Sequence, residues 1–316
     1  MAFETIVAVI ALIAGIALLT FSSDKAVEHS VSIASEWGVS PLMIGLVLVS
    51  LGTDLPEIVN SIEASLLGHG DIDVGTSLGS VLAQMSLVLG LLPFLARGFK
   101  VKRKKVLVIG ACEVLALILA VSIAEKGYIS QINAFFLVVS WIIFMLLIRS
   151  LTRKKIKEKE EMVVSADERH LHHFVIAIFG FMGVAIGALI VIESVITLST
   201  ALNVSEYIIS FFIVAIGTSL PELVVDYMAV RKKQYELAIG DIIGSSIVDA
   251  GFSIGIGPLF FPITVDGTLA MVTGLYAIFV SVVVISLLAL REKIDRKIGA
   301  LFIALYLLSY ATLGVI

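Results

Sequence analysis

Two glutamates follow prolines at repeated positions in this chain, and each pair lies inside an apolar stretch. Residues 52–57 read Gly-Thr-Asp-Leu-Pro-Glu, and residues 217–222 read Gly-Thr-Ser-Leu-Pro-Glu. Pro56 and Pro221 have no backbone N–H, so the helix carbonyls four residues earlier lose their partners. Unpaired carbonyls are tolerated within a bilayer only where they line a cavity or meet a cation. The repeated phrase therefore predicts an ion-binding site to which both copies contribute.

Glu57 and Glu222 bring negative charge to this predicted site. An ionised carboxylate at the middle of a membrane costs at least ~2.5–3.5 kcal/mol, so two of them together need cations. Other oxygen donors lie in the two copies, or at i, i+4 spacing on the helices that follow them: Thr53, Thr218, Ser219, Ser80, Gln84, Ser245 and Asp249. No His or Cys accompanies them, which argues against zinc or copper. Carboxylates, hydroxyls and carbonyls in a flexible cage suit Ca²⁺ and also Na⁺.

The duplication extends beyond the phrase at a constant offset of 165 residues. Gly75 and Gly79 recur as Gly240 and Gly244, and each pair is spaced by one helical turn. Small residues at this spacing let helices approach closely. We therefore expect these glycines to serve helix packing rather than direct ion binding.

The composition indicates the kind of chain that must hold this site. Of 316 residues, 59% are hydrophobic and 15% are charged, against about 25% charged in soluble domains. The sequence therefore predicts an all-α integral membrane protein that crosses the bilayer several times. A spanning helix needs ~20 mostly apolar residues, and ten segments qualify: 3–22, 38–67, 72–96, 106–125, 129–149, 173–199, 205–230, 236–263, 268–290 and 298–315.

The positions of Lys and Arg support the count of ten. Of the 22 Lys and Arg residues, all but Lys126 fall on loops of one parity. Such loops are typically cytoplasmic, so both termini are predicted to lie outside the cell. Five helices per half then make the duplication an inverted repeat, with a pseudo-two-fold axis in the membrane plane. We expect a first half over 1–150 with its repeat at about 43–95, a cytoplasmic linker over 151–170, and a second half over 171–316 with its repeat at about 208–260.

At this point the motifs resemble those of the Ca²⁺:cation antiporter superfamily, in its sodium/calcium exchanger branch of the prokaryotic type. That family carries Gly-Thr-Ser-Leu-Pro-Glu and a following Gly-Ser-x-x-x-Asn/Asp in each of two repeats. The second repeat here matches throughout, with Gly244, Ser245 and Asp249 completing it. The resemblance implies that Glu57 and Glu222 are the central Ca²⁺ ligands. It also implies four adjacent cation sites completed by Thr53, Ser80, Thr218, Ser219, Ser245, Asp249 and the backbone at Ser50 and Ala215, and that the first and sixth helices slide across the rest.

Two positions depart from the family pattern. Asp54 stands where the family usually has Ser, and Gln84 stands where it usually has Asn. Asp54 adds an acid beside Glu57, so with Glu222 and Asp249 four carboxyl groups share one cavity. Either the site binds more positive charge, or one acid stays protonated. The coupling ion is therefore open between Na⁺, which we take as the default, and H⁺.

The leading hypothesis is a secondary active antiporter that exchanges Ca²⁺ for Na⁺ by alternating access. The alternative is antiport of Ca²⁺, or another divalent cation, against H⁺. A cation channel is a more distant alternative, and an intramembrane aspartyl protease gives no reason for the duplicated glutamates. We expect no enzyme activity, no cofactor beyond the transported Ca²⁺ and Na⁺ (or H⁺), and no nucleotide or nucleic-acid partner, since no P-loop is present. The expected partners are inorganic cations and the lipid bilayer, for a monomeric chain in the plasma membrane.

Two further groups of side chains each allow two interpretations. Asp226, one turn from Glu222, and Asp241 could line an inner vestibule or lie at the membrane interface. His170, His172 and His173 could bind a metal, although a solvated position at the membrane border is the simpler interpretation.

Overall fold

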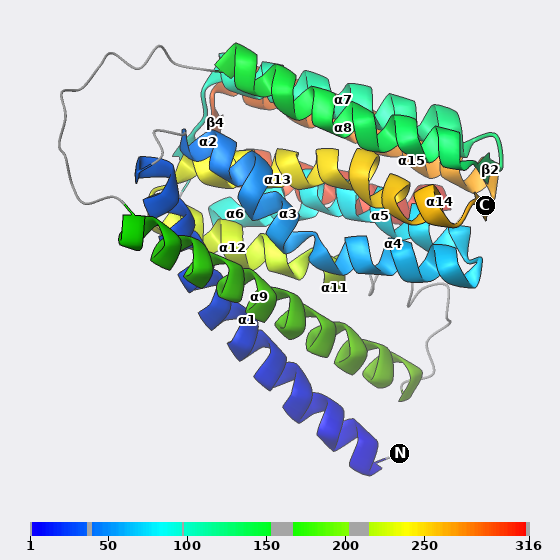
Figure 1. The fold of residues 1–316 in the computed structure, drawn as a ribbon, viewed down its shortest axis with the longest axis horizontal. Coiled ribbons are helices and arrows are strands. Elements are labelled where there is room, and N and C mark those ends of the chain that lie inside the picture. The colour runs from blue at the N-terminus through cyan, green and yellow to red at the C-terminus, as the bar shows by residue number, and fades with distance from the viewer. Residues whose placement is uncertain (1, 37–39, 97, 153–166, 202–214, 314–316) are drawn as a thin grey trace.

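The protein is almost entirely helical. We describe it from a computed structural model that covers residues 2–36, 40–96, 98–152, 167–201 and 215–313 (Figure 1). Most of the predicted linker, at 153–166, and the start of the seventh predicted span, at 205–214, lie outside these ranges.

The first half begins with one long helix, which continues beyond the apolar span predicted at 3–22. The elements of this half are α1 (Ala2–Glu36), α2 (Pro41–Ile44), η1 (Gly45–Val49), α3 (Ser50–Thr53), α4 (Leu55–Leu67), α5 (Gly70–Leu82), η2 (Ala83–Val88), α6 (Leu89–Leu95), β1 (Phe99–Lys100), α7 (Arg103–Ala124), β2 (Tyr128–Ile129) and α8 (Gln131–Thr152). The three segments labelled η are π-helical turns within longer helices.

Among the described residues, the second half repeats most of these elements at the same spacing. They are α9 (Asp167–Ala201), α11 (Ala215–Thr218), α12 (Leu220–Arg231), α13 (Tyr235–Ile247), η4 (Val248–Ser253), α14 (Ile254–Phe260), β3 (Ile263–Thr264), α15 (Gly267–Arg291), β4 (Lys293–Ile294) and α16 (Arg296–Leu313). The bounds of α1, α3, α5, η2 and α6, shifted by 165 residues, are those of α9, α11, α13, η4 and α14. In the part of the chain that the structure describes, the duplication in sequence is therefore a duplication of structure, and it includes the π-helical turns η2 and η4.

Several of these helices are long and apolar enough to cross a membrane. Among the described residues, five spans qualify by length and composition: Gly70–Leu95, Arg103–Ala124, Gln131–Leu151, Tyr235–Phe260 and Gly267–Arg291. A sixth is formed if the bent pair Pro41–Thr53 and Leu55–Leu67 counts as one span. The chain is a multi-pass membrane protein, and the full count of ten stays a prediction.

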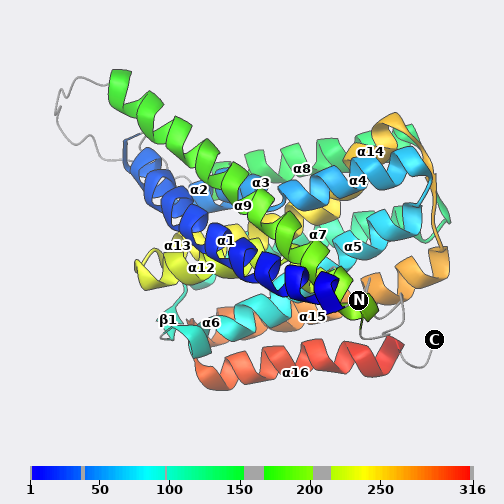
Figure 2. The same cartoon turned by 90° about the horizontal axis from the view of Figure 1, so that it is seen from below.

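The helices form a central group with covers on either side. The broken helices that hold the repeated phrases lie in the middle of the molecule, with α7, α8 and α15 along one side (Figure 1). On the other side α1 and α9 lie side by side as an oblique pair, as both views show (Figures 1 and 2). This pair is closely packed, because a Cβ added at Gly180 of α9 would lie 2.9 Å from the backbone nitrogen of Ala26 in α1.

Two short ribbons tie the halves together at opposite ends of the molecule. Strand β1 pairs antiparallel with β4, with Phe99 opposite Ile294, and β2 pairs antiparallel with β3, with Ile129 opposite Ile263. Each ribbon takes one strand from each half. The two halves therefore exchange equivalent strands, which is what a two-fold relation between them produces.

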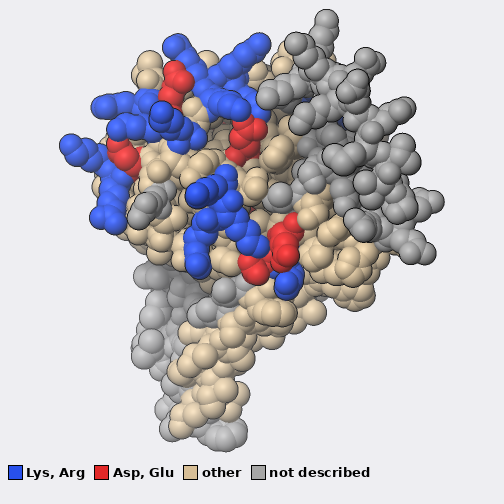
Figure 3. Space-filling model, turned by 90° about the vertical axis from the view of Figure 1, so that its left-hand side faces the viewer, with Lys and Arg blue, Asp and Glu red and all other residues tan. Residues whose placement is uncertain are grey.

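Lys and Arg side chains gather at the end of the molecule that carries β1 and β4 (Figure 3). Several take part in ion pairs there: Lys105 bonds Glu236 at 2.7 Å, Lys293 bonds Asp295 at 2.8 Å, and Lys232 bonds Asp24 of α1 at 2.7 Å. We call this the basic end. It agrees with the prediction that the Lys and Arg loops share one side of the membrane.

The glycines of α13 lie against the helix that carries the first repeated phrase. A Cβ added at Gly240 would lie 2.3 Å from the carbonyl oxygen of Leu42, and one at Gly244 would lie 2.8 Å from Cα of Leu46. Both neighbours are backbone atoms, which cannot swing away as a side chain can. The expected close approach of helices is found at these two positions. It is not found at Gly75, where an added Cβ would meet no other atom within 4 Å.

Gly240→Ala is expected to lower the free energy of unfolding by about 1–3 kcal/mol, the usual cost of overpacking. Gly75→Ala is the matched control, because its new Cβ would meet no other atom within 4 Å. Alanine's higher helix propensity should leave that variant at least as stable as the wild type. Thermal unfolding of both variants in detergent measures the difference, and equal midpoints would contradict the packing argument.

Candidate functional site

Each repeated phrase breaks its helix at a single residue. Helix α3 ends at Thr53, Asp54 has φ −80° and ψ 6°, and α4 begins at Leu55. In the second copy α11 ends at Thr218, Ser219 has φ −85° and ψ 2°, and α12 begins at Leu220. The helix axis bends by 49° across the first break. The proline in the first turn after each break fixes the start of the new helix, because it needs no N–H partner there.

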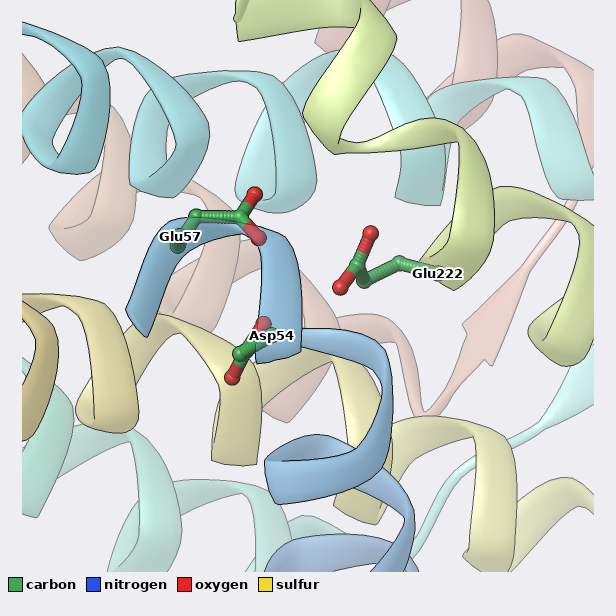
Figure 4. Close-up of side chains that lie close together, drawn as sticks. All are labelled: Asp54, Glu57 and Glu222. Carbon is green, nitrogen blue, oxygen red and sulfur yellow. The ribbon is translucent and has the colours of Figure 1, made fainter. Parts of the chain in front are cut away.

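The two breaks bring three carboxyl groups to one place. Asp54 and Glu57 come from the first copy and Glu222 from the second, and each offers an oxygen within 4.8 Å of the others. Figure 4 shows the three side chains pointing toward a common space. They are between 0% and 1% exposed. Among the described residues this is the sole group of three or more acidic, His or Cys side chains so close together.

Hydroxyl groups cross between the repeats around these carboxyl groups. Thr53 Oγ1 lies 3.4 Å from Ser245 Oγ, and Ser80 Oγ lies 3.1 Å from Thr218 Oγ1. Thr53 and Thr218 are equivalent positions, as are Ser80 and Ser245, so the two contacts are copies of each other. Ser80 Oγ also donates to Glu57 Oε1 at 3.3 Å. Reciprocal contacts of this kind place a pseudo-two-fold axis through the site.

Gln84 and Asp249 meet on that axis. They are equivalent positions 165 residues apart, and Gln84 Nε2 donates to Asp249 Oδ2 at 3.0 Å. Ser246 Oγ donates to Gln84 Oε1 at 3.0 Å and orients the amide. Sequence reasoning missed Ser246, because the equivalent position in the first half is Val81 and the repeat therefore gave no signal.

Many oxygens at the site accept no hydrogen bond from the described residues. They are both carboxylate oxygens of Asp54 and of Glu222, Oε2 of Glu57, Oδ1 of Asp249 and Oγ of Ser219. Buried charges in proteins are paired or coordinate metal ions. The oxygens named here are ligand atoms of the kind that Ca²⁺ and Na⁺ prefer. The residues present therefore fit one or more hard cations.

Of the two expected backbone ligands, the carbonyl of Ser50 already accepts hydrogen bonds, and Ala215 is only partly described. The carbonyl of Ser50 already accepts from the backbone nitrogen of Asp54 at 2.9 Å and from Thr53 Oγ1 at 3.2 Å, while its own hydroxyl donates to Leu46 O at 2.8 Å. Ala215 is the first residue of α11, and its side chain lies outside the described part of the chain.

The predicted histidine cluster includes a residue that sequence reasoning missed. His29 Nδ1 of α1 lies 2.7 Å from His173 Nδ1 of α9, and the His172 ring lies 6.1 Å from that of His29. The side chain of His170 lies outside the described part of the chain. The pair joins the two oblique helices. His29 and His173 are 144 residues apart in the sequence, so their contact could not be predicted from the sequence.

Comparison with known proteins decides the family. Residues 7–149 and 172–314 match the family model described as "Sodium/calcium exchanger protein". This chain belongs to the sodium/calcium exchanger family. The resemblance predicted from the repeated phrases is thereby confirmed.

Relatives and solved structures in this family cover nearly the whole chain. The chain is 32% identical over 301 residues to an uncharacterized membrane protein, MJ0091, of Methanocaldococcus jannaschii, and the match covers 95% of each. It is 27% identical over 335 residues to the sodium/calcium exchanger MaX1 of Methanosarcina acetivorans, over 93% of this chain and 95% of MaX1. The structure of the sodium-calcium exchanger NCX_Mj soaked with Na⁺ without Ca²⁺ superposes with a TM-score of 0.82 at 31% identity, over 98% of this chain and 99% of that one.

Glu222→Gln is expected to raise the stability of the ion-free protein by roughly 1–3 kcal/mol, because it removes a buried charge that lacks a donor. It should also reduce the stabilisation that added Ca²⁺ gives. Thermal unfolding at mildly alkaline pH, with a chelator and then with Ca²⁺, measures both effects.

Glu113→Gln is the control for that variant. Glu113 is also fully buried, but it lies in α7 and accepts a hydrogen bond from Ser281 Oγ at 2.7 Å. Its substitution should leave the response to Ca²⁺ unchanged. A loss of the response in both variants would show that the assay reports buried acids in general.

Proposed function

We propose that this protein is a secondary active antiporter that exchanges Ca²⁺ for Na⁺ across the plasma membrane. The observation that carries the proposal is the cluster of Asp54, Glu57 and Glu222 at two symmetrically placed helix breaks. Buried carboxylates with so few hydrogen-bond donors require cations, and contributions from both inverted repeats fit a site that each side of the membrane reaches in turn. The names of MaX1 and NCX_Mj describe the same exchange.

The proposed ligands are the oxygens that converge on this cluster. They are the carboxylates of Asp54, Glu57, Glu222 and Asp249, the hydroxyls of Thr53, Thr218, Ser219, Ser80 and Ser245, the amide oxygen of Gln84, and the backbone at Ser50 and Ala215. A Ca²⁺ ion neutralises two of the charges, and Na⁺ ions that replace it must supply the same positive charge. Competition for one set of carboxylates is what couples the two fluxes in this proposal.

Alternating access needs an element that uncovers the cluster on one side at a time. The α1–α9 pair suits this role, since it packs along the broken helices and α9 covers the first break, where a Cβ on Gly52 would meet the Phe181 ring at 2.4 Å. Lys232 holds Asp24 of α1 at the basic end. We take the basic end as cytoplasmic and the termini as external. One chain supplies the whole site, so the proposed working unit is a monomer.

Proton coupling is the second candidate, and one observation favours it. Asp54 is fully buried and accepts no hydrogen bond from the described residues, while the equivalent position holds Ser219. An acid in this place either attracts a further cation or carries a proton. An open channel is disfavoured, because the three clustered carboxyl groups are at most 1% exposed.

Glu57→Gln is expected to lower Na⁺-driven uptake of ⁴⁵Ca²⁺ into proteoliposomes by at least about 10–100-fold, the range found when the support of a metal ligand is lost. Glu113→Gln should transport like the wild type. Wild-type vesicles that show no ⁴⁵Ca²⁺ uptake with either a Na⁺ or a proton gradient would overturn the proposed exchange.

Asp54→Ser gives the first repeat the residue that the second repeat already has. Na⁺-driven uptake should persist in this variant, while any uptake driven by a proton gradient alone should disappear. The two gradients are imposed separately on the same vesicles. If the ion dependence of Asp54→Ser equals that of the wild type, Asp54 does not set the coupling ion.

A further inference from the structure

Three histidines from the two oblique helices gather near the basic end. His29 lies in α1, and His172 and His173 lie in α9. Asp24, five residues before His29 on α1, pairs with Lys232 at the basic end, which places the three imidazoles on that side of the central cluster. They are separate from the clustered carboxyl groups, so the proposed exchange does not explain them.

The shortest contact in this group is between His29 and His173. Their Nδ1 atoms lie 2.7 Å apart, and their ring centroids lie 4.9 Å apart. The centroid of His172 lies 6.1 Å from that of His29 and 5.8 Å from that of His173. The same nitrogen atom of two rings therefore faces one point between the helices, and a third ring lies at the border of that point.

This geometry is close to that of two imidazoles bound to one metal ion. Imidazole nitrogens lie ~2.0–2.1 Å from a bound transition ion, so two of them are roughly 2.9–3.3 Å apart at angles between 90° and the tetrahedral angle. A small rotation of either ring widens the observed separation of 2.7 Å to that range. Histidine is largely neutral at pH 7.5, and the neutral ring is the form that binds metal ions.

A metal ion also needs a route from water. His172 is exposed, and His29 and His173 are each partly buried. The point between the two Nδ1 atoms is therefore reached from the side of His172, in contrast to the fully enclosed central cluster. Water can complete the coordination there, and the exposed ring of His172 is free to turn toward a bound ion.

We propose that His29 and His173 bind a divalent transition-metal ion between α1 and α9, with His172 beside it. Imidazole nitrogen suits ions such as Zn²⁺, Ni²⁺ and Cu²⁺, whereas Ca²⁺ and Na⁺ prefer oxygen. The two ligands come from different helices, so the ion links α1 to α9 and holds them together as one body. The site is distinct from that of the exchanged ions, and the inference does not rest on the proposed function.

Titration of the purified full chain with Cu²⁺, without a histidine tag, tests the site, because Cu²⁺ binds most tightly in the first-row series. Pulsed EPR detects the remote nitrogen of each Cu²⁺-bound imidazole and so distinguishes histidine from carboxylate ligands. At one Cu²⁺ per chain, the wild type is expected to show at least two bound imidazoles. His29→Gln should lose that signal and bind at least about tenfold more weakly, because His172 and His173 are adjacent on one helix and do not face each other.

His69→Gln is the matched control, since His69 is an exposed histidine between α4 and α5. It should keep the signal of two imidazoles. Size-exclusion profiles report whether each variant is folded. If His29→Gln is not, His172→Gln combined with His173→Gln removes both of these α9 imidazoles and should lose the same signal.

Two results would overturn the metal site. One is a wild type with fewer than two bound imidazoles, which is expected if His29 and His173 only share a hydrogen bond. The other is a His29→Gln variant that keeps two. Neither result bears on the exchange of Ca²⁺, which depends on the central cluster.

Discussion

The structure depends on one constraint: several carboxyl groups are held at the centre of a membrane protein without enough donors to satisfy them. Asp54, Glu57 and Glu222 converge there because two helices break at equivalent residues and turn toward each other. In a continuous helix, the carbonyl groups would accept hydrogen bonds from the N–H groups of the same helix, and the acids would lie on one face. The proline after each break lowers the free-energy cost of interrupting the helix, because it has no N–H group that needs a partner. The surrounding hydroxyls supply oxygens without adding further charge.

The duplication explains how such a site can be assembled reliably. Because each half supplies one break, one Thr and one Ser at equivalent positions, the contact between Thr and Ser across the site is made twice. Thr53 with Ser245 and Thr218 with Ser80 are one contact repeated by symmetry. The exchanged strands β1, β4, β2 and β3 hold the halves in the same relation at both ends. The glycines of α13 complete the arrangement, since only a residue without Cβ lets the backbone of Leu42 come so near.

Much of this could be predicted from the sequence, since the prolines, acids and hydroxyls that form the cluster recur at a fixed offset. The rest depends on contacts that leave no periodic trace. Ser246 has no polar copy in the first half, and His29 meets α9 only through the packing of α1. Hydropathy also ended the first helix at residue 22, whereas α1 continues to Glu36, because polar residues such as Lys25 and Glu28 continue a helix as well as apolar ones do.

The hydrogen bond between Gln84 and Asp249 has a consequence for the origin of the fold. In a dimer of two identical halves, a residue on the symmetry axis faces its own copy. Two aspartates there would repel each other, and two glutamines would offer the passing ion no charge. Fusing both halves into one polypeptide removes the requirement that the partners be the same. A pair of two different residues, such as Gln84 and Asp249, can therefore form within a single polypeptide. It could not form in an ancestor assembled from two identical subunits.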